Sequence, residues 1–103
     1  MNLDKMLKQM QKAQEKMAEI QAELATKSVE ASAGGGMVKV VVGGDGTLQA
    51  IEIDREVVDP EDIEMLQDLI VAAVNEGKRR SSELATAEMR KAAGGMGLPP
   101  GLL

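Results

Sequence analysis

The sequence contains no cysteine and no histidine. These absences exclude disulfides, thiolate nucleophiles, imidazole acid–base chemistry and the usual ligand sets of structural zinc. The remaining acid–base candidates are aspartate, glutamate, lysine and arginine, and they stand in no familiar catalytic spacing. We therefore predict that this protein is not an enzyme and that it takes no metal ion, no cofactor and no small-molecule substrate.

Phenylalanine, tyrosine and tryptophan are also absent. Proteins that grip single-stranded nucleic acid stack bases on aromatic rings, at about 1–3 kcal/mol per base, so this class is excluded. No apolar run approaches the roughly 18 residues of a membrane span. The first residues carry frequent charges and no apolar core of a signal peptide. We expect no membrane association and a cytoplasmic location.

What is present is one small domain with an uneven charge. The chain has 103 residues, 44% of them hydrophobic and 28% charged, and a net charge of −5. Residues 1–27 hold five lysines and four acids, residues 28–76 hold two bases and eleven acids, and residues 77–103 hold five bases and two acids. Both ends are therefore basic, and the acid lies in the middle. The distribution of charge along the chain predicts its binding partners better than the net charge does.

A heptad seam runs through the first quarter of the chain. Its apolar residues recur at spacings of three and four, with strong helix formers between them. They are Leu3, Met6, Met10, Ala13, Met17, Ile20 and Leu24. The predicted helix, about residues 2–27, would measure about 39 Å. So long a seam requires a partner helix, from this chain or a second one, as in a coiled coil. The seam methionines are expected to be core residues.

The middle of the chain predicts an antiparallel three-stranded sheet. Residues 29–33 alternate weakly, residues 37–42 are β-branched, and residues 47–53 form a third apolar segment. Glycines 34–36 separate the first pair, and residues 43–46, with the tight-turn pair Asp45-Gly46, separate the second. Turn chemistry explains these glycines, because they lack the spacing of a phosphate-binding loop.

A second long helix follows. Asp59 is the predicted N-cap and Pro60 the first helical residue, and an apolar face continues to about Ala93. Gly94-Gly95 is predicted to end the helix. The predicted fold class is α+β, in the order α-β-β-β-α, with two long helices flanking the sheet. Residues 1–93 form the single domain, and residues 94–103 a flexible glycine- and proline-rich tail.

Four segments together resemble the YbaB/EbfC family of nucleoid-associated proteins. They are LDKMLKQMQKAQEKM, EASAGGGMVKVVVGGDG, EMLQDLIVAAVNEG and GGMGLPPG, and the resemblance covers nearly the whole chain. It implies a homodimer in which helices protrude as paired arms, likened to tweezers. It also implies binding of double-stranded DNA with limited sequence preference, in the nucleoid, with an effect on nucleoid organisation or gene expression.

The first candidate DNA-binding set is a lysine row on the first helix. At 100° per residue its members fall within an arc of about 80°, centred about 125° from the seam. The members are Lys5, Lys8, Lys12 and Lys16. Flexible point charges suit backbone phosphates rather than base edges. The alternative is a solvated face with ion pairs from Lys12 to Glu15 and from Lys16 to Glu19.

The second candidate set is a group of bases on the other helix. Its predicted DNA-binding members are Lys78, Arg79, Arg90 and Lys91. The alternative is pairing with Glu76 and Glu83, or packing of the long side chains over an apolar seam. Arg80 is expected to be structural, because it lies nearest the apolar face. The acidic middle of the chain would keep DNA away from the body.

A second function class stays open. Two long helices joined by hairpins are arranged similarly to prefoldin, an analogy of fold alone. A protein-interaction module or small chaperone of this kind would present the methionine-rich seam to clients and would have no affinity for DNA.

Overall fold

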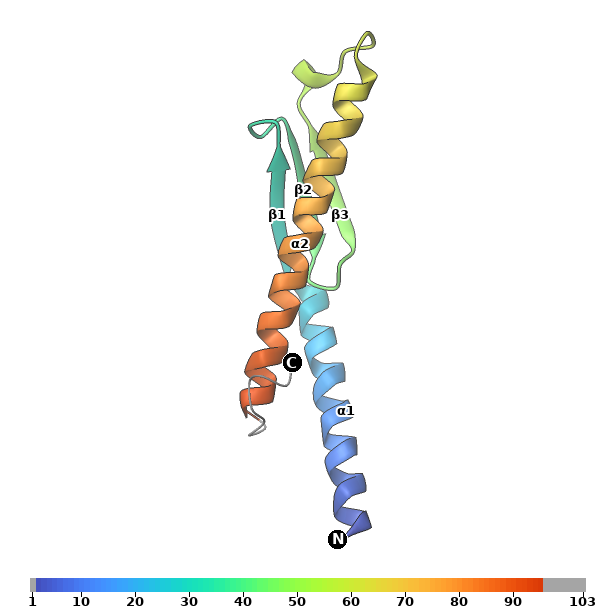
Figure 1. The fold of residues 1–103 in the computed structure, drawn as a ribbon, viewed down its shortest axis with the longest axis vertical. Coiled ribbons are helices and arrows are strands. Elements are labelled where there is room, and N and C mark those ends of the chain that lie inside the picture. The colour runs from blue at the N-terminus through green and yellow to red at the C-terminus, as the bar shows by residue number, and fades with distance from the viewer. Residues whose placement is uncertain (1, 96–103) are drawn as a thin grey trace.

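A long helix, a three-stranded sheet and a second long helix follow one another along the chain in a computed structural model, which describes residues 2–95 (Figure 1). The elements are α1 (Leu3–Thr26), β1 (Ser28–Ala33), β2 (Val38–Gly43), β3 (Leu48–Ile53), the short 3-10 helix η1 (Arg55–Val57) and α2 (Ile63–Gly95). The predicted order α-β-β-β-α is confirmed. The molecule is elongated, with extents of 69 × 22 × 17 Å.

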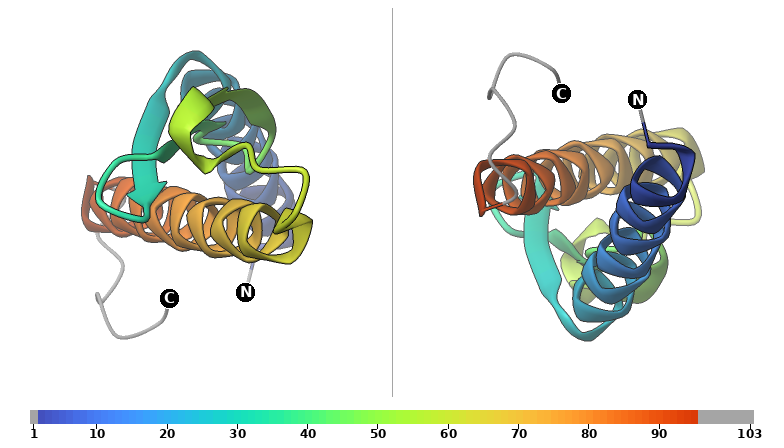
Figure 2. Two further views of the ribbon diagram at one scale, coloured as in Figure 1. Left: turned by 90° about the horizontal axis from the view of Figure 1, so that it is seen from above. Right: turned by 90° about the horizontal axis from the view of Figure 1, so that it is seen from below.

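The sheet has the order β1-β2-β3, and both pairs are antiparallel. The turn between β1 and β2 places Gly34, Gly35 and Gly36 at positive φ, a conformation that other residues adopt only under strain. Register places Val38, Val40 and Val42 on one face, and all three are buried. The views along the long axis show α2 lying against this face (Figure 2).

Small residues let α2 approach the sheet closely. A Cβ at Gly77 would lie 2.7 Å from Val42 Cγ2 and 3.0 Å from Val40 Cγ2, so the helix backbone nearly touches the valines. Ala73, one turn earlier, is fully buried. The buried Ser81 hydroxyl donates to the Gly43 carbonyl at 2.7 Å, which satisfies its hydrogen-bonding capacity.

The predicted start of the second helix is wrong by three residues. Asp59 forms a turn instead: its side chain accepts from the Glu61 amide and its carbonyl accepts from the Asp62 amide. The side chain of Asp62 accepts from the Met65 amide at 3.2 Å, the usual N-cap interaction. The sequence offers two aspartates with capping chemistry, and the chain uses the second for α2. Helix η1, which buries Val57, was not predicted.

The far end of α2 also differs from the prediction. The helix includes Gly94 and Gly95, because glycine costs a helix only about 1 kcal/mol and does not forbid it. Residues 96–103 of the predicted tail lie outside the described residues. Within residues 2–95, no helix is both long enough and apolar enough for a membrane span.

Helix α1 is attached to the body at one end only. Ile20 and Leu24 are buried, and the Gly44 amide donates to the Lys27 carbonyl at 2.8 Å. The seam beyond them is open: Met6, Met10 and Met17 are 40%, 57% and 42% exposed. Within residues 2–95 no other element extends alongside these methionines, so this part of the chain does not bury them. Burial of the seam against a second chain, which the heptad pattern equally allows, stays a prediction.

Candidate nucleic-acid interface

The lysine row lies along the projecting part of α1 (Figure 1). Asn2 caps this helix: its side-chain oxygen accepts from the amides of Asp4 and Lys5 at 3.0 and 3.4 Å. The cap satisfies two backbone amides in the first turn of α1, whose residues are exposed and so gain little stability from packing on the rest of residues 2–95. The row is thereby carried to the tip of the molecule, away from the body.

Three of the four lysines are electrostatically available. Within residues 2–95, Lys5, Lys8 and Lys12 form no ion pair, whereas Lys16 lies 3.6 Å from Glu19. The alternative pairing of Lys16 is therefore present and that of Lys12 with Glu15 is not. An exposed pair at i,i+3 is weak, so the whole row can reach phosphates.

The bases in the middle of α2 are already engaged. Arg79 forms a two-pronged contact with Glu76, at 3.0 and 2.6 Å, and a further ion pair with Glu83. Arg80 donates to Glu76 at 3.1 Å and to the Glu30 carbonyl of β1 at 2.7 Å. The pairing that stood as the alternative at Arg79 is the one present. Because Arg79 is paired with Glu76 and Glu83, it is less available to bind DNA than an unpaired base.

Lys78, Arg90 and Lys91 complete the predicted set. The Lys78 ammonium donates to the Gly46 carbonyl at 3.0 Å, which fastens α2 to the turn between β2 and β3. Arg90 and Lys91 are exposed near the end of α2 and form no ion pair with residues 2–95. The end of α2 that carries them runs toward the same end of the molecule as the free end of α1 (Figure 1). The available bases thus gather at one end.

One contact that sequence reasoning missed holds the two helices together. Lys27, just after α1, forms an ion pair with Glu88 of α2 at 2.9 Å. This hydrogen bond raises the pKa of Lys27 and lowers that of Glu88. The Glu88 side chain is only 16% exposed. The partners are 61 residues apart, so no local pattern could have revealed the pair.

Seven of the 17 acids gather at the end opposite the tip of α1, around the segment between β3 and α2 (Figure 1). They are Asp54, Glu56, Asp59, Glu61, Asp62, Glu64 and Asp68. An acidic end and a basic end along a 69 Å axis orient the molecule in the field of a polyanion. We therefore expect a nucleic acid to approach the basic end, with α1 and the end of α2.

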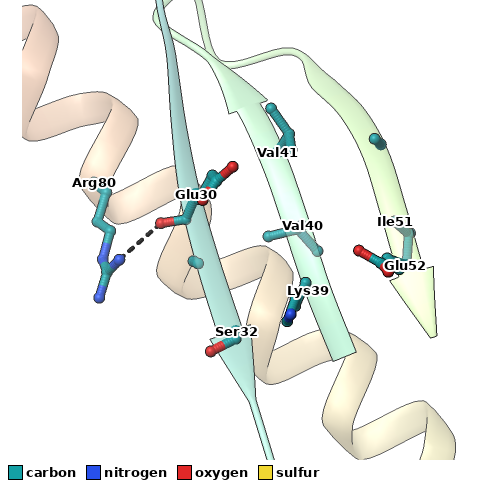
Figure 3. A pocket seen from close by; sticks show the side chains of 10 residues that line it. Glu30, Ser32, Lys39, Val40, Val41, Ile51, Glu52 and Arg80 are labelled. Carbon is teal, nitrogen blue, oxygen red and sulfur yellow. Dashed lines mark hydrogen bonds between the residues drawn. The ribbon is translucent and has the colours of Figure 1, made fainter. Parts of the chain in front are cut away.

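A hollow of about 450 Å³ lies over the face of the sheet that α2 does not cover (Figure 3). Register places Glu30, Lys39 and Glu52 on that face, and Arg80 reaches its margin. The charges are mixed, and the two glutamates disfavour phosphate. Nothing among the described lining residues provides a metal-binding group of acids. We assign the hollow no role in DNA binding.

Glu76 gives the protein a specific acid dependence. Hydrogen bonds from Arg79 lower the pKa of Glu76 from 4.5 to about 2. A group whose pKa is lowered by folding stabilises the native state above its unfolded pKa, and this contribution falls between about pH 4.5 and 2. The substitution Glu76→Gln should therefore lower Tm by a few degrees at pH 6, with the two Tm curves converging near pH 2. Thermal unfolding followed by circular dichroism checks this, and an equal difference at every pH would contradict it.

Known proteins resemble this chain over nearly its whole length. A sequence model described as the YbaB/EbfC DNA-binding family matches residues 1–96. A nucleoid-associated protein of Syntrophobacter fumaroxidans is 60% identical over 100 residues, covering 93% of this chain and 91% of that protein. One from Acetivibrio thermocellus is 54% identical over 101 residues, covering 98% and 89%. The crystal structure of an uncharacterized Helicobacter pylori protein shares the fold, with a TM-score of 0.73 and 24% identity over 81% of this chain and 87% of that one.

Proposed function

The chain belongs to the YbaB/EbfC DNA-binding family, and from that premise we propose that it is a nucleoid-associated protein that binds double-stranded DNA as a homodimer. Contacts are chiefly to the backbone, and sequence specificity is low. The protein acts in the cytoplasm, on the nucleoid, where binding affects nucleoid organisation or gene expression. The observation that carries the proposal is the row of available lysines on a helix that projects from the body.

The lysine row predicts how binding responds to salt. A dimer with four lysines per arm can neutralise at most about eight phosphates, at about −0.9 in the slope of log K against log salt per contact. We expect a slope between about −3 and −7 with labelled duplex DNA, measured by fluorescence anisotropy between 50 and 200 mM salt. Scrambled duplexes should bind with similar affinity, because lysines on phosphates carry no base information. A slope near zero, or no binding by a folded dimer, would contradict the proposal.

The surface that supports dimerisation lies beside β3. Register places Leu48, Ile51 and Ile53 on the same face as the buried valines of β2. These three residues are nevertheless 38–42% exposed, because α2 packs on β1 and β2 instead. Val71 of α2 is also exposed. It lies two helical turns before Lys78, which contacts the β2–β3 turn, so helical periodicity places Val71 on the same flank of α2 as Lys78. We call Leu48, Ile51, Ile53 and Val71 the β3 shelf.

The β3 shelf is suited to a second copy of itself. It is apolar and uncharged, so it offers nothing to phosphates, and it continues the core outward. Part of the shelf is a strand, β3, and part is a flank of helix α2. A two-fold axis along the molecule would set the helix flank of each copy against the strand of the other and leave both α1 helices pointing the same way.

A charge on the shelf should separate the protomers. Ile51→Asp places a carboxylate in the proposed interface and should convert the dimer to a folded monomer, measured by light scattering after size exclusion. The matched control is Ala50→Asp, because Ala50 lies next to Ile51 but points to the opposite face. It should leave the dimer intact. Dissociation by the control alone would place the interface on the other face of the sheet.

A second candidate function is a protein-interaction module or small chaperone without affinity for DNA. The exposed methionines of the α1 seam favour it, since methionine adapts to varied apolar partners. The two functions use different sides of one helix. Substitutions in the lysine row should affect only the first.

A further inference from the structure

Two features remain unused by the proposed function: the open part of the α1 seam and the apolar segment that follows α2. Met10 and Met17 lie on the seam with more than 40% of their surface exposed. The lysine row is centred about 125° around the helix from them, so DNA bound at the row leaves the seam uncovered. An exposed apolar surface of this kind favours a partner.

The segment after α2 has the chemistry to cover the seam. Residues 96–103 read MGLPPGLL, with one methionine, three leucines and no charged side chain. Pro99 and Pro100 carry no backbone N–H group, so burying this stretch against an apolar surface sacrifices fewer hydrogen bonds to water. Consecutive prolines also favour an extended conformation with little entropy to lose on binding.

The segment starts close enough to reach the seam. From the Lys27–Glu88 contact, α1 and α2 run toward the same end of the molecule (Figure 1). Gly95 lies about 10 Å beyond Glu88, whereas Met17 and Met10 lie about 15 and 25 Å from Lys27, at 1.5 Å per residue. Met17 and Met10 are therefore about 5 and 15 Å further along the axis than Gly95. Eight extended residues span at most about 26–29 Å, which leaves length to cross from one helix to the other.

We propose that residues 96–103 bind the α1 seam of the same chain, over Met10 and Met17. Bound there, the segment covers the part of the apolar seam around Met10 and Met17 that residues 2–95 leave exposed. Binding there braces α1 against α2 on the side away from the lysine row. The inference does not depend on DNA binding. It depends only on whether residues 96–103 contact the α1 seam.

Disulfide trapping tests the contact directly, because the natural chain has no cysteine. The variant Met10→Cys/Leu102→Cys should form an intramolecular disulfide under mild oxidation at least about ten times faster than Lys12→Cys/Leu102→Cys. Lys12 lies 3 Å along the helix from Met10 but about 200° around it, so the control has the same reach and the wrong face. Equal rates would overturn the proposal. A product of twice the chain mass as the main species would also overturn it, by assigning the seam to a second copy.

Removal of the segment gives an independent measurement on an otherwise natural chain. Deletion of residues 96–103 should increase hydrogen exchange of the α1 amides around Met10 and Met17 several-fold and increase the fluorescence of an apolar dye. The amides of β2, buried beneath α2, serve as the internal control for an intact fold. Unchanged exchange in α1 and unchanged dye fluorescence would overturn the proposal.

Discussion

The double substitution Lys8→Glu/Lys12→Glu should weaken binding to duplex DNA at least about hundredfold at 50 mM salt. The two lysines lie in the middle of the lysine row and form no ion pair with residues 2–95. A dimer loses four of at most about eight phosphate contacts and gains four repulsive charges. The slope of log K against log salt should fall by about half, since each contact contributes about −0.9. Fluorescence anisotropy at two salt concentrations measures both quantities.

The control for this experiment must carry the same change in net charge. Lys39→Glu/Arg55→Glu provides it, because Lys39 lies on the uncovered sheet face and Arg55 in η1, both away from the arms. It should change the affinity less than about threefold, through the long-range field alone. Similar losses in both variants would mean that net charge governs binding and that the lysine row has no special part. Unchanged affinity in Lys8→Glu/Lys12→Glu would remove the row from the interface and favour the interaction module.

The substitution Gly44→Ala should destabilise the protein by about 2–3 kcal/mol, the largest effect expected for the addition of one methyl group. A Cβ at Gly44 would lie 2.4 Å from the Leu24 carbonyl oxygen and 3.1 Å from its carbon. These are backbone atoms at the end of α1, and the Gly44 amide donates to the Lys27 carbonyl next to them. Relief of the clash therefore requires α1 to move away from the sheet. Urea unfolding measures the loss of stability.

Gly94→Ala is the matched control for the added methyl group. Nothing lies within 4 Å of a Cβ at this position, and the residue is helical. Alanine exceeds glycine in helix propensity by about 1 kcal/mol, so the variant should be as stable as the parent or more stable. A Gly44→Ala protein of parental stability would show that α1 is not fastened at this point, and the fixed direction of the lysine row would then lack its support.

The order of elements could be predicted because it depends on neighbours in sequence. The heptad seam, the β-branched segment before Gly43 and the Asp45-Gly46 turn each specify their structure within a few residues. The glycine run 34–36 could be placed in a turn because only glycine adopts positive φ three times in succession without strain. The start of α2 could not be placed, because Asp59 and Asp62 both have capping chemistry and a local pattern does not rank them.

Among the candidate site residues, local spacing again decided what was predictable. The contacts of Arg79 with Glu76 and Glu83 lie within one helical turn and stood as an explicit alternative. The Lys27–Glu88 pair and the Lys78 contact with Gly46 join residues 61 and 32 positions apart. Such contacts form only after the sheet has brought distant segments of the chain together. The spacing of residues in the sequence therefore does not predict them.

The sequence by itself determined the element order, the position of the lysine row about 125° around the helix from the seam, and the separation of acid from base along the chain, because helical periodicity and composition are local properties. The tertiary structure alone decided which surfaces stay uncovered. Helix α2 has room for only two of the three strands, so the β3 shelf is exposed. Among residues 2–95, Ile20 and Leu24 are the only α1 residues that become buried, so the seam beyond them projects with its methionines exposed. Burial depends on which elements meet in space, and a heptad pattern records only that a partner is needed.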